Sequence, residues 1–196
     1  MTAAADQRAS VYSPIARALH WIVVVLIAVQ VTMGIIMVYE APQPNFWVRL
    51  SDALAFYSAH KLLGVVLLLL VILRLANRLG RGVPPAEPTL TTWQREMSTL
   101  VHSWLYFLLL LVPLLGWIGT SLYPALTVFD WFALPALTAP NRPLSVPVFA
   151  AHKIAAFTLI ALVGMHVTAA LYHHFVRRDG VLGRMLPRMS RRGPNF

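Results

Sequence analysis

Residues 21–38 read WIVVVLIAVQVTMGIIMV, a stretch of 18 positions without one charged side chain. A run of this kind is long enough for a transmembrane helix, which needs about 20 apolar residues to cross a hydrocarbon core about 30 Å thick. A second apolar run covers residues 62–73. Neither run alternates apolar with polar residues, as a half-buried β-strand would. These runs therefore predict membrane-spanning helices.

The composition of the whole chain agrees with a membrane protein. Of its 196 residues, 58% are hydrophobic and only 12% are charged, whereas about 25% are charged in an ordinary soluble domain. Such hydrophobicity excludes a disordered chain. The chain has no cysteine, which excludes a disulfide-stapled secreted miniprotein and an iron–sulfur cluster.

Four spans are expected, over about residues 13–39, 54–79, 93–123 and 148–176. Ser13 should cap the first span, with Pro14 at its first helical position, and Pro113 should kink the third. The proline-rich segments 41–44, 83–88 and 124–147 are expected to be loops. The first span is too long for a signal peptide and no cleavage site follows it. The fold class expected is an all-α integral membrane protein, with residues 1–196 forming one four-helix transmembrane domain.

The basic residues indicate how the spans are oriented. The net charge of +9 comes from residues that lie almost entirely outside the apolar runs, so it favours membrane topology over nucleic-acid binding. The N-terminus, the second connection and the C-terminal tail hold 12 of the 16 lysines and arginines. The other side holds four: Arg49, Lys61, Arg142 and Lys153. Because cytoplasmic loops carry the excess of basic residues, both termini should face the cytoplasm.

Histidines within the spans suggest function, because an ionisable group inside a bilayer is costly. Five lie within or at the edges of the spans: His20, His60, His102, His152 and His166. Any one of them alone could simply hydrogen-bond a neighbouring helix. His152 and His166, however, are 14 residues apart on one span, which puts them on nearly one face and about 21 Å apart. A proton relay needs closer steps, whereas two prosthetic groups held at two depths need this separation.

When the same offset of 14 residues is applied to the histidines of the other spans, the candidate residues fall at two depths in the membrane, which we call the outer and the inner level. The outer level contains His60, His152, Gly34 and Gly116, and the inner level contains His20, His102, His166 and Arg74. Two histidines and two glycines can cradle a porphyrin, because the imidazoles bind iron and the glycines leave room for the macrocycle. Plain contact between helices is the alternative role for the glycines.

Bis-histidine b-type heme fits these levels best. The outer ligands are His60 and His152. At the inner level His166 takes one position, while His20 and His102 compete for the other, and the one left over could hydrogen-bond a propionate or a quinone. Zinc needs a cluster of histidine, cysteine and carboxylate ligands, and blue copper needs cysteine. Covalent c-type attachment needs Cys-x-x-Cys-His, which is absent.

Several polar residues near these levels have more than one possible role. Lys61 and Lys153 directly follow the outer histidines and could pair with heme propionates, attract an anion, or merely mark the end of a span. Arg17 and Arg74 could neutralise propionates on the inner side or only set the topology. His173 and His174, at the inner end of the fourth span, could contact a propionate or a quinone, or belong to a solvated helix end.

These residues resemble the bacterial four-helix cytochrome b561 family, and closely its superoxide:ubiquinone oxidoreductase members. The resemblance covers essentially the whole chain. It rests on Leu19-His20-Trp21, on His60, on the His152/His166 pair, and on Ala170-Leu171-Tyr172-His173-His174-Phe175 followed by Asp179, Leu182, Arg184, Met185, Pro187 and Arg188. It implies two b hemes, the inner one on His20 and His166 and the outer one on His60 and His152, with His102 off the iron. The first connection, residues 40–59, is longer here than in those members.

The resemblance also implies a function. The chain would be an oxidoreductase of the bacterial cytoplasmic membrane, embedded in lipid, that passes electrons from periplasmic superoxide to the ubiquinone pool. Bis-histidine iron is saturated, so it suits electron transfer and not oxygen binding. The four basic residues of the outer face would steer an anionic donor. Two alternatives remain open at this point: a cytochrome b anchor that takes electrons from a partner dehydrogenase or hydrogenase subunit, and a small transporter with histidines in a polar path.

Overall fold

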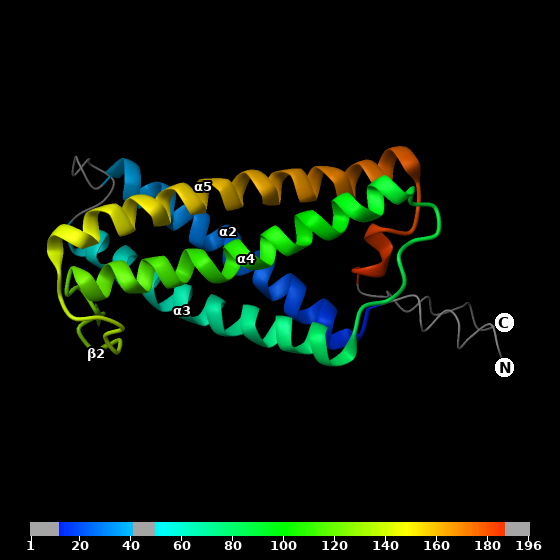
Figure 1. Ribbon diagram of the computed structural model, residues 1–196. Helices are drawn as coiled ribbons and strands as arrows, with labels where there is room; N and C mark the ends of the chain where they lie inside the picture. The colour runs from blue at the N-terminus through cyan, green and yellow to red at the C-terminus, as the bar shows by residue number, and fades with distance from the viewer. Residues whose placement is uncertain (1–11, 41–49, 187–196) are drawn as a thin grey trace, which may run out of the picture.

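The computed structural model describes residues 12–40 and 50–186. They contain four long helices: α2 (Pro14–Glu40), α3 (Leu50–Arg81), α4 (Thr92–Leu122) and α5 (Arg142–Tyr172). Each includes a segment long and apolar enough to cross a membrane: Pro14–Met37, Ala55–Arg81, Thr92–Leu122 and, extending past the end of α5, Arg142–Arg177. The prediction of an all-α four-helix membrane bundle is confirmed (Figure 1).

The helices run up and down, and helices adjacent in sequence pack against each other. The start of α2 and the last described residues lie at one end of the bundle, which we call the inner end (Figure 1). Two hydrogen bonds join them, from Trp21 Nε1 to the Met185 carbonyl and from Arg17 to the Leu186 carbonyl, both 2.9 Å. A small β-hairpin lies at the opposite, outer end.

Local sequence signals explain where the helices begin. The Ser13 hydroxyl accepts a hydrogen bond from the Ala16 amide (3.2 Å), as expected of the cap before Pro14. Thr91 and Gln94 form a capping box at the start of α4. Pro113 lies inside α4.

The fourth helix begins earlier than expected, at Arg142 and not near residue 148. Asn141 caps it by accepting a hydrogen bond from the Leu144 amide (3.2 Å), and a proline occupies its first turn. Proline suits the first turn because no intrahelical partner exists for an amide there. Pro147 is therefore inside the helix and not the end of a loop.

The expected loop between the third and fourth spans contains the hairpin of β1 (Thr127–Val128) and β2 (Phe132–Ala133). Phe129 and Asp130, at the turn, have φ of 50° and 58°. Tight hairpin turns favour residues with positive φ, because the backbone twist of such a turn matches the twist of the two strands that it joins. The turn lacks the Asn-Gly or Asp-Gly pair that would have revealed it from sequence. Beyond α5 the chain forms a π-helix, η1 (His173–Arg177), and a 3₁₀ turn, η2 (Leu182–Arg184).

An apolar core fills the middle of the bundle, with side chains from all four helices. It consists of Val23, Leu67, Val71, Leu105, Leu108, Leu109, Ala155 and Leu159. These residues lie between the two ends, so the core separates two polar regions that each contain histidines.

Candidate functional site

Two histidines face each other in the outer half of the bundle. His60 of α3 and His152 of α5 have ring centroids 6.2 Å apart, with ring planes at 83°. Metal–imidazole bonds of about 2.0–2.1 Å put the centroids of two rings on opposite faces of one metal about 6 Å apart. The spacing of this pair therefore fits two imidazoles that would hold one iron between them.

The inner half of the bundle brings together three imidazoles. His20 of α2 and His166 of α5 have centroids 6.4 Å apart, at 80°. His102 of α4 lies closer to His166, at 5.1 Å and 79°. The wider pair matches the spacing of the outer pair, whereas the shorter distance is too small for two imidazoles on opposite sides of one metal. The three residues expected at this level do meet, and their spacing favours His20 and His166 as the pair.

The glycines of the outer level lie directly against the outer imidazoles. A Cβ on Gly34 would lie 3.6 Å from His60 Cε1, and one on Gly116 would lie 3.2 Å from His152 Cε1. The expected level of both glycines is confirmed. They make room for the imidazole rings themselves, a role that differs from the expected one of making room only for the macrocycle.

Hydrogen bonds fix the orientation of two of the five imidazoles. His152 Nδ1 donates to the Val112 carbonyl (2.8 Å), and His102 Nδ1 donates to the Ser98 carbonyl (2.5 Å). A carbonyl can only accept, so Nδ1 carries the proton and Nε2 keeps a free lone pair. This is the state in which an imidazole binds a metal.

The outer pair opens on a large cavity of about 1250 Å³. Its lining includes both outer imidazoles, Gly34, Gly116 and the ammonium-bearing Lys61 and Lys153. Ordinary small-molecule sites measure about 300–1,000 Å³, so this cavity has room for a macrocycle beside the two imidazoles. Ligand spacing, glycine cradle and cavity together fit a b-type heme.

The two lysines near the outer imidazoles differ in the hydrogen bonds that they make. Lys61 donates to the carbonyls of Ala125 (3.0 Å) and Thr127, and so holds the outer hairpin. Among the described residues Lys153 makes no hydrogen bond or ion pair, and it is exposed. Lys153 is therefore the free cation of the two. Arg49 lies outside the described residues.

Arginines of the inner end also donate hydrogen bonds to backbone carbonyls, and two of them stack on a tyrosine ring. Besides the bond from Arg17 to the chain end, Arg74 donates to the Ala16 carbonyl (3.1 Å). Arg74 and Arg78, one turn apart on α3, both stack over the ring of Tyr106, at 5.8 and 5.6 Å. Neither has an acidic partner among the described residues. Arg78 and Tyr106 were not expected at this site, although the i, i+4 spacing of the two arginines is visible in the sequence.

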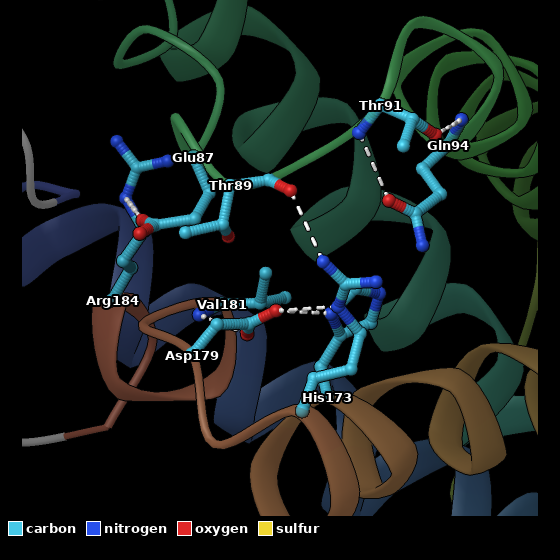
Figure 2. A network of polar contacts seen from close by, with 9 residues as sticks. Glu87, Thr89, Thr91, Gln94, His173, Asp179, Val181 and Arg184 are labelled. Carbon is cyan, nitrogen blue, oxygen red and sulfur yellow. Dashed lines mark hydrogen bonds and ion pairs between the residues drawn. The ribbon is translucent and has the colours of Figure 1, made fainter.

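His173 belongs to a polar network at the inner end (Figure 2). Its Nδ1 donates to Asp179 Oδ2 (2.6 Å), and the Arg177 guanidinium lies 3.4 Å from the same oxygen. The Asp179 side chain is only 4% exposed. Loss of water raises the pKa of this carboxyl, but hydrogen bonds from His173 and from the Val181 amide outweigh that effect and lower the pKa below its ordinary value. His174 is exposed and packs on Phe175.

The same network folds the C-terminal segment onto the connection between α3 and α4. We call residues 179–186 the C-terminal cap. Arg184 donates to the Pro85 carbonyl (2.6 Å) and lies 4.0 Å from Glu87, while Arg177 donates to the Thr89 carbonyl (3.1 Å). The motif residues of the C-terminal cap, which had no structural role assigned from the sequence, thus close the inner end of the bundle. Pro187 and Arg188 of that motif lie outside the described residues.

Replacing Asp179 by asparagine is expected to open the C-terminal cap. Amide hydrogen exchange in residues 179–186 should accelerate by about 10- to 100-fold, since hydrogen bonds to a charged group contribute about 1.5–3 kcal/mol. Because the pKa of the folded carboxyl is lowered, its stabilising effect is present above about pH 3.9 and is lost as the pH falls through the lowered value. Glu96→Gln, an exposed change on α4, is the control, and unchanged exchange in Asp179→Asn would contradict the role of the carboxylate.

Paired imidazoles at two depths of a four-helix membrane bundle are features of a membrane cytochrome b. The comparisons with known proteins agree. The family model for prokaryotic cytochrome b561 matches residues 11–188. The chain belongs to the prokaryotic cytochrome b561 family. It is accordingly a multi-pass protein of the bacterial inner membrane, of a family that binds b-type heme and serves electron transfer.

Several relatives, among them the following three, match nearly the whole chain. Cytochrome b561 homolog 2 of Escherichia coli (strain K12) is 27% identical over 180 residues, which cover 91% of this chain and 93% of the relative. The probable superoxide oxidase CybB of Yersinia pestis is 23% identical, covering 90% and 96%. Cytochrome b562 of Cereibacter sphaeroides is 29% identical, covering 89% and 94%.

Proposed function

We propose that this chain is a diheme cytochrome b that passes electrons from superoxide on the periplasmic side to ubiquinone. The observation that carries the proposal is the matched spacing of two imidazole pairs, 6.2 Å between His60 and His152 and 6.4 Å between His20 and His166. Each pair would hold one b-type heme. A bound heme would supply a reversible one-electron couple, with two histidines as its protein ligands.

Residues of the chain would hold the hemes and keep the two histidine levels apart. His152 is turned toward its partner by the Val112 carbonyl, and the apolar core separates the two histidine levels. His102 is proposed to contact a propionate or quinone beside the inner pair and not to bind iron; its Nε2 lone pair can accept a hydrogen bond from a protonated propionic acid or from the hydroxyl of a quinol. His173 is held by Asp179, so His174 is the more available of those two for a quinone or propionate.

The membrane orientation of this proposal has both termini in the cytoplasm. In support, the inner end carries a concentration of arginines: Arg17, Arg74, Arg78, Arg81, Arg95, Arg177, Arg178 and Arg184. The positive-inside rule puts such an end on the cytoplasmic side. The outer cavity then faces the periplasm.

Superoxide as donor is supported by the name of the Yersinia pestis relative and by the free ammonium of Lys153 at the outer cavity. Overall, two superoxide anions each lose one electron to give two molecules of O₂. One ubiquinone takes up those two electrons with two protons and becomes ubiquinol.

The purified chain alone is expected to reduce a soluble ubiquinone when superoxide is generated, and the rate should fall as ionic strength rises, because charge steering is screened over about 10 Å at 0.1 M salt. Lys153→Gln should lower the rate several-fold at low salt and flatten the salt dependence, while Lys153→Arg should keep both. Quinone reduction is followed by absorbance. A chain that is inert with superoxide but active once a dehydrogenase or hydrogenase subunit is added would instead be the anchor of a larger complex.

A further inference from the structure

The two outer imidazoles differ in how their Nδ1 atoms are held. His152 Nδ1 donates to the Val112 carbonyl. His60 Nδ1 is enclosed and, within the part of the chain that the structure describes, has no hydrogen-bond partner. An imidazole that binds a metal through Nε2 carries its proton on Nδ1 and almost always donates it to a carbonyl, carboxylate or water. His60 therefore lacks the partner that iron binding would require.

Gln30 of α2 lies directly beside His60. Its Nε2 donates to the His60 carbonyl at 3.0 Å. Its Oε1 is enclosed and, among the described residues, is also without a partner. A Cβ on Gly64, one turn beyond His60, would lie 3.1 Å from Gln30 Nε2. The missing side chain at Gly64 thus lets the amide approach the helix that carries His60.

The two unmatched atoms are complementary. A protonated Nδ1 can only donate, and an amide oxygen can only accept. A buried donor and a buried acceptor left unpaired are both costly. Ser58, the nearest hydroxyl along α3, already accepts a hydrogen bond from the Phe129 amide (3.1 Å). Gln30 and His60 both line the outer cavity, and their two unmatched atoms are both enclosed.

We propose that Gln30 is a positioning residue for His60: its Oε1 accepts the Nδ1 proton of His60 when Nε2 binds the outer iron. The inference rests on the proposed function, because it requires His60 to be an iron ligand. A hydrogen bond from Nδ1 makes the imidazole more basic. It therefore favours the oxidised iron and holds the ring in one orientation.

The test compares reduction potentials in the purified, heme-loaded protein. Gln30→Met keeps the length of the side chain but removes the amide. It is expected to shift the outer heme to a more positive midpoint potential, by up to a tenfold change in the ratio of reduced to oxidised iron, which is 59 mV for one electron. The inner heme should not move. The outer heme is identified as the one that a His60→Ala variant lacks.

Electron paramagnetic resonance of the oxidised protein gives a second readout, because the signal of low-spin iron depends on ligand basicity and ring orientation. The outer signal should change in Gln30→Met and stay unchanged in Thr32→Val. Thr32 is a matched control on α2, since its exposed hydroxyl donates only to the Ala28 carbonyl (2.9 Å).

Gln30→Asn, which withdraws the amide by one methylene, is the second variant should the methionine protein fail to fold. It is expected to shift the outer potential in the same direction by a smaller amount. An unchanged outer potential and an unchanged outer signal in a folded variant with both hemes overturn the role of Gln30 and leave the proposed function intact. A His60→Ala protein that keeps both hemes overturns the proposed function instead.

Discussion

Replacing His152 by alanine is expected to remove the outer heme and halve the heme content of the purified protein, from two per chain to one. His152 and His60 are the imidazoles that line the outer cavity, and the described part of that cavity holds no third histidine to take the vacated position. Losing a ligand should exceed the 10- to 100-fold loss of metal affinity that follows loss of a residue that only orients one. A pyridine hemochrome assay against protein concentration measures the ratio.

Thr158→Val is the control for this measurement. Thr158 lies on the same helix as His152, outside the lining of the outer cavity, and its exposed hydroxyl donates to the Ile154 carbonyl (2.9 Å), so its loss should leave two hemes per chain. A wild-type ratio of one heme per chain would contradict the two-level arrangement altogether. A His152→Ala protein that retains two hemes would remove His152 from the ligand set while leaving the fold unaffected.

The two levels were predictable because helix geometry is fixed. Fourteen residues on a straight helix correspond to a set rotation and rise, so His152 and His166 alone define two depths. The same offset on antiparallel spans then found Gly34 and Gly116, which do lie against the outer imidazoles. The sequence could not choose between His20 and His102, because both lie at the inner depth. That choice depends on distances between helices.

Contacts that depend on how the helices are rotated against one another could not be predicted from the sequence. The Gln30–His60 contact joins residues 30 positions apart on different helices, and no periodicity within either helix reveals it. Lys61 was expected to pair with a propionate, to attract an anion or only to mark the end of a span, yet it donates to the Ala125 and Thr127 carbonyls beside a hairpin that no turn signal predicted. The pairing of His173 with Asp179 follows a π-helix, an irregular turn that apolar periodicity does not encode.

The inner pair gives the second large effect. Replacing His20 by alanine is expected to remove the inner heme and to lower superoxide-driven quinone reduction by at least 100-fold, while the outer heme stays. The reason is the 6.4 Å spacing of His20 and His166, which fits one metal between two imidazoles. Heme content and the quinone assay are measured on the same preparation.

His102→Ala is the matched comparison, since His102 is the other imidazole at that depth and lies 5.1 Å from His166. Its Nδ1 is held by the Ser98 carbonyl of its own helix, so its ring cannot move freely to the position of His20. The alanine variant should therefore keep two hemes, and any loss of quinone reduction would then come from contacts around the inner heme. If His102→Ala loses the inner heme and His20→Ala keeps it, the inner ligand is His102, and ring spacing does not identify the ligands at that level. The assignment of His60 and His152 to the outer heme would not be affected.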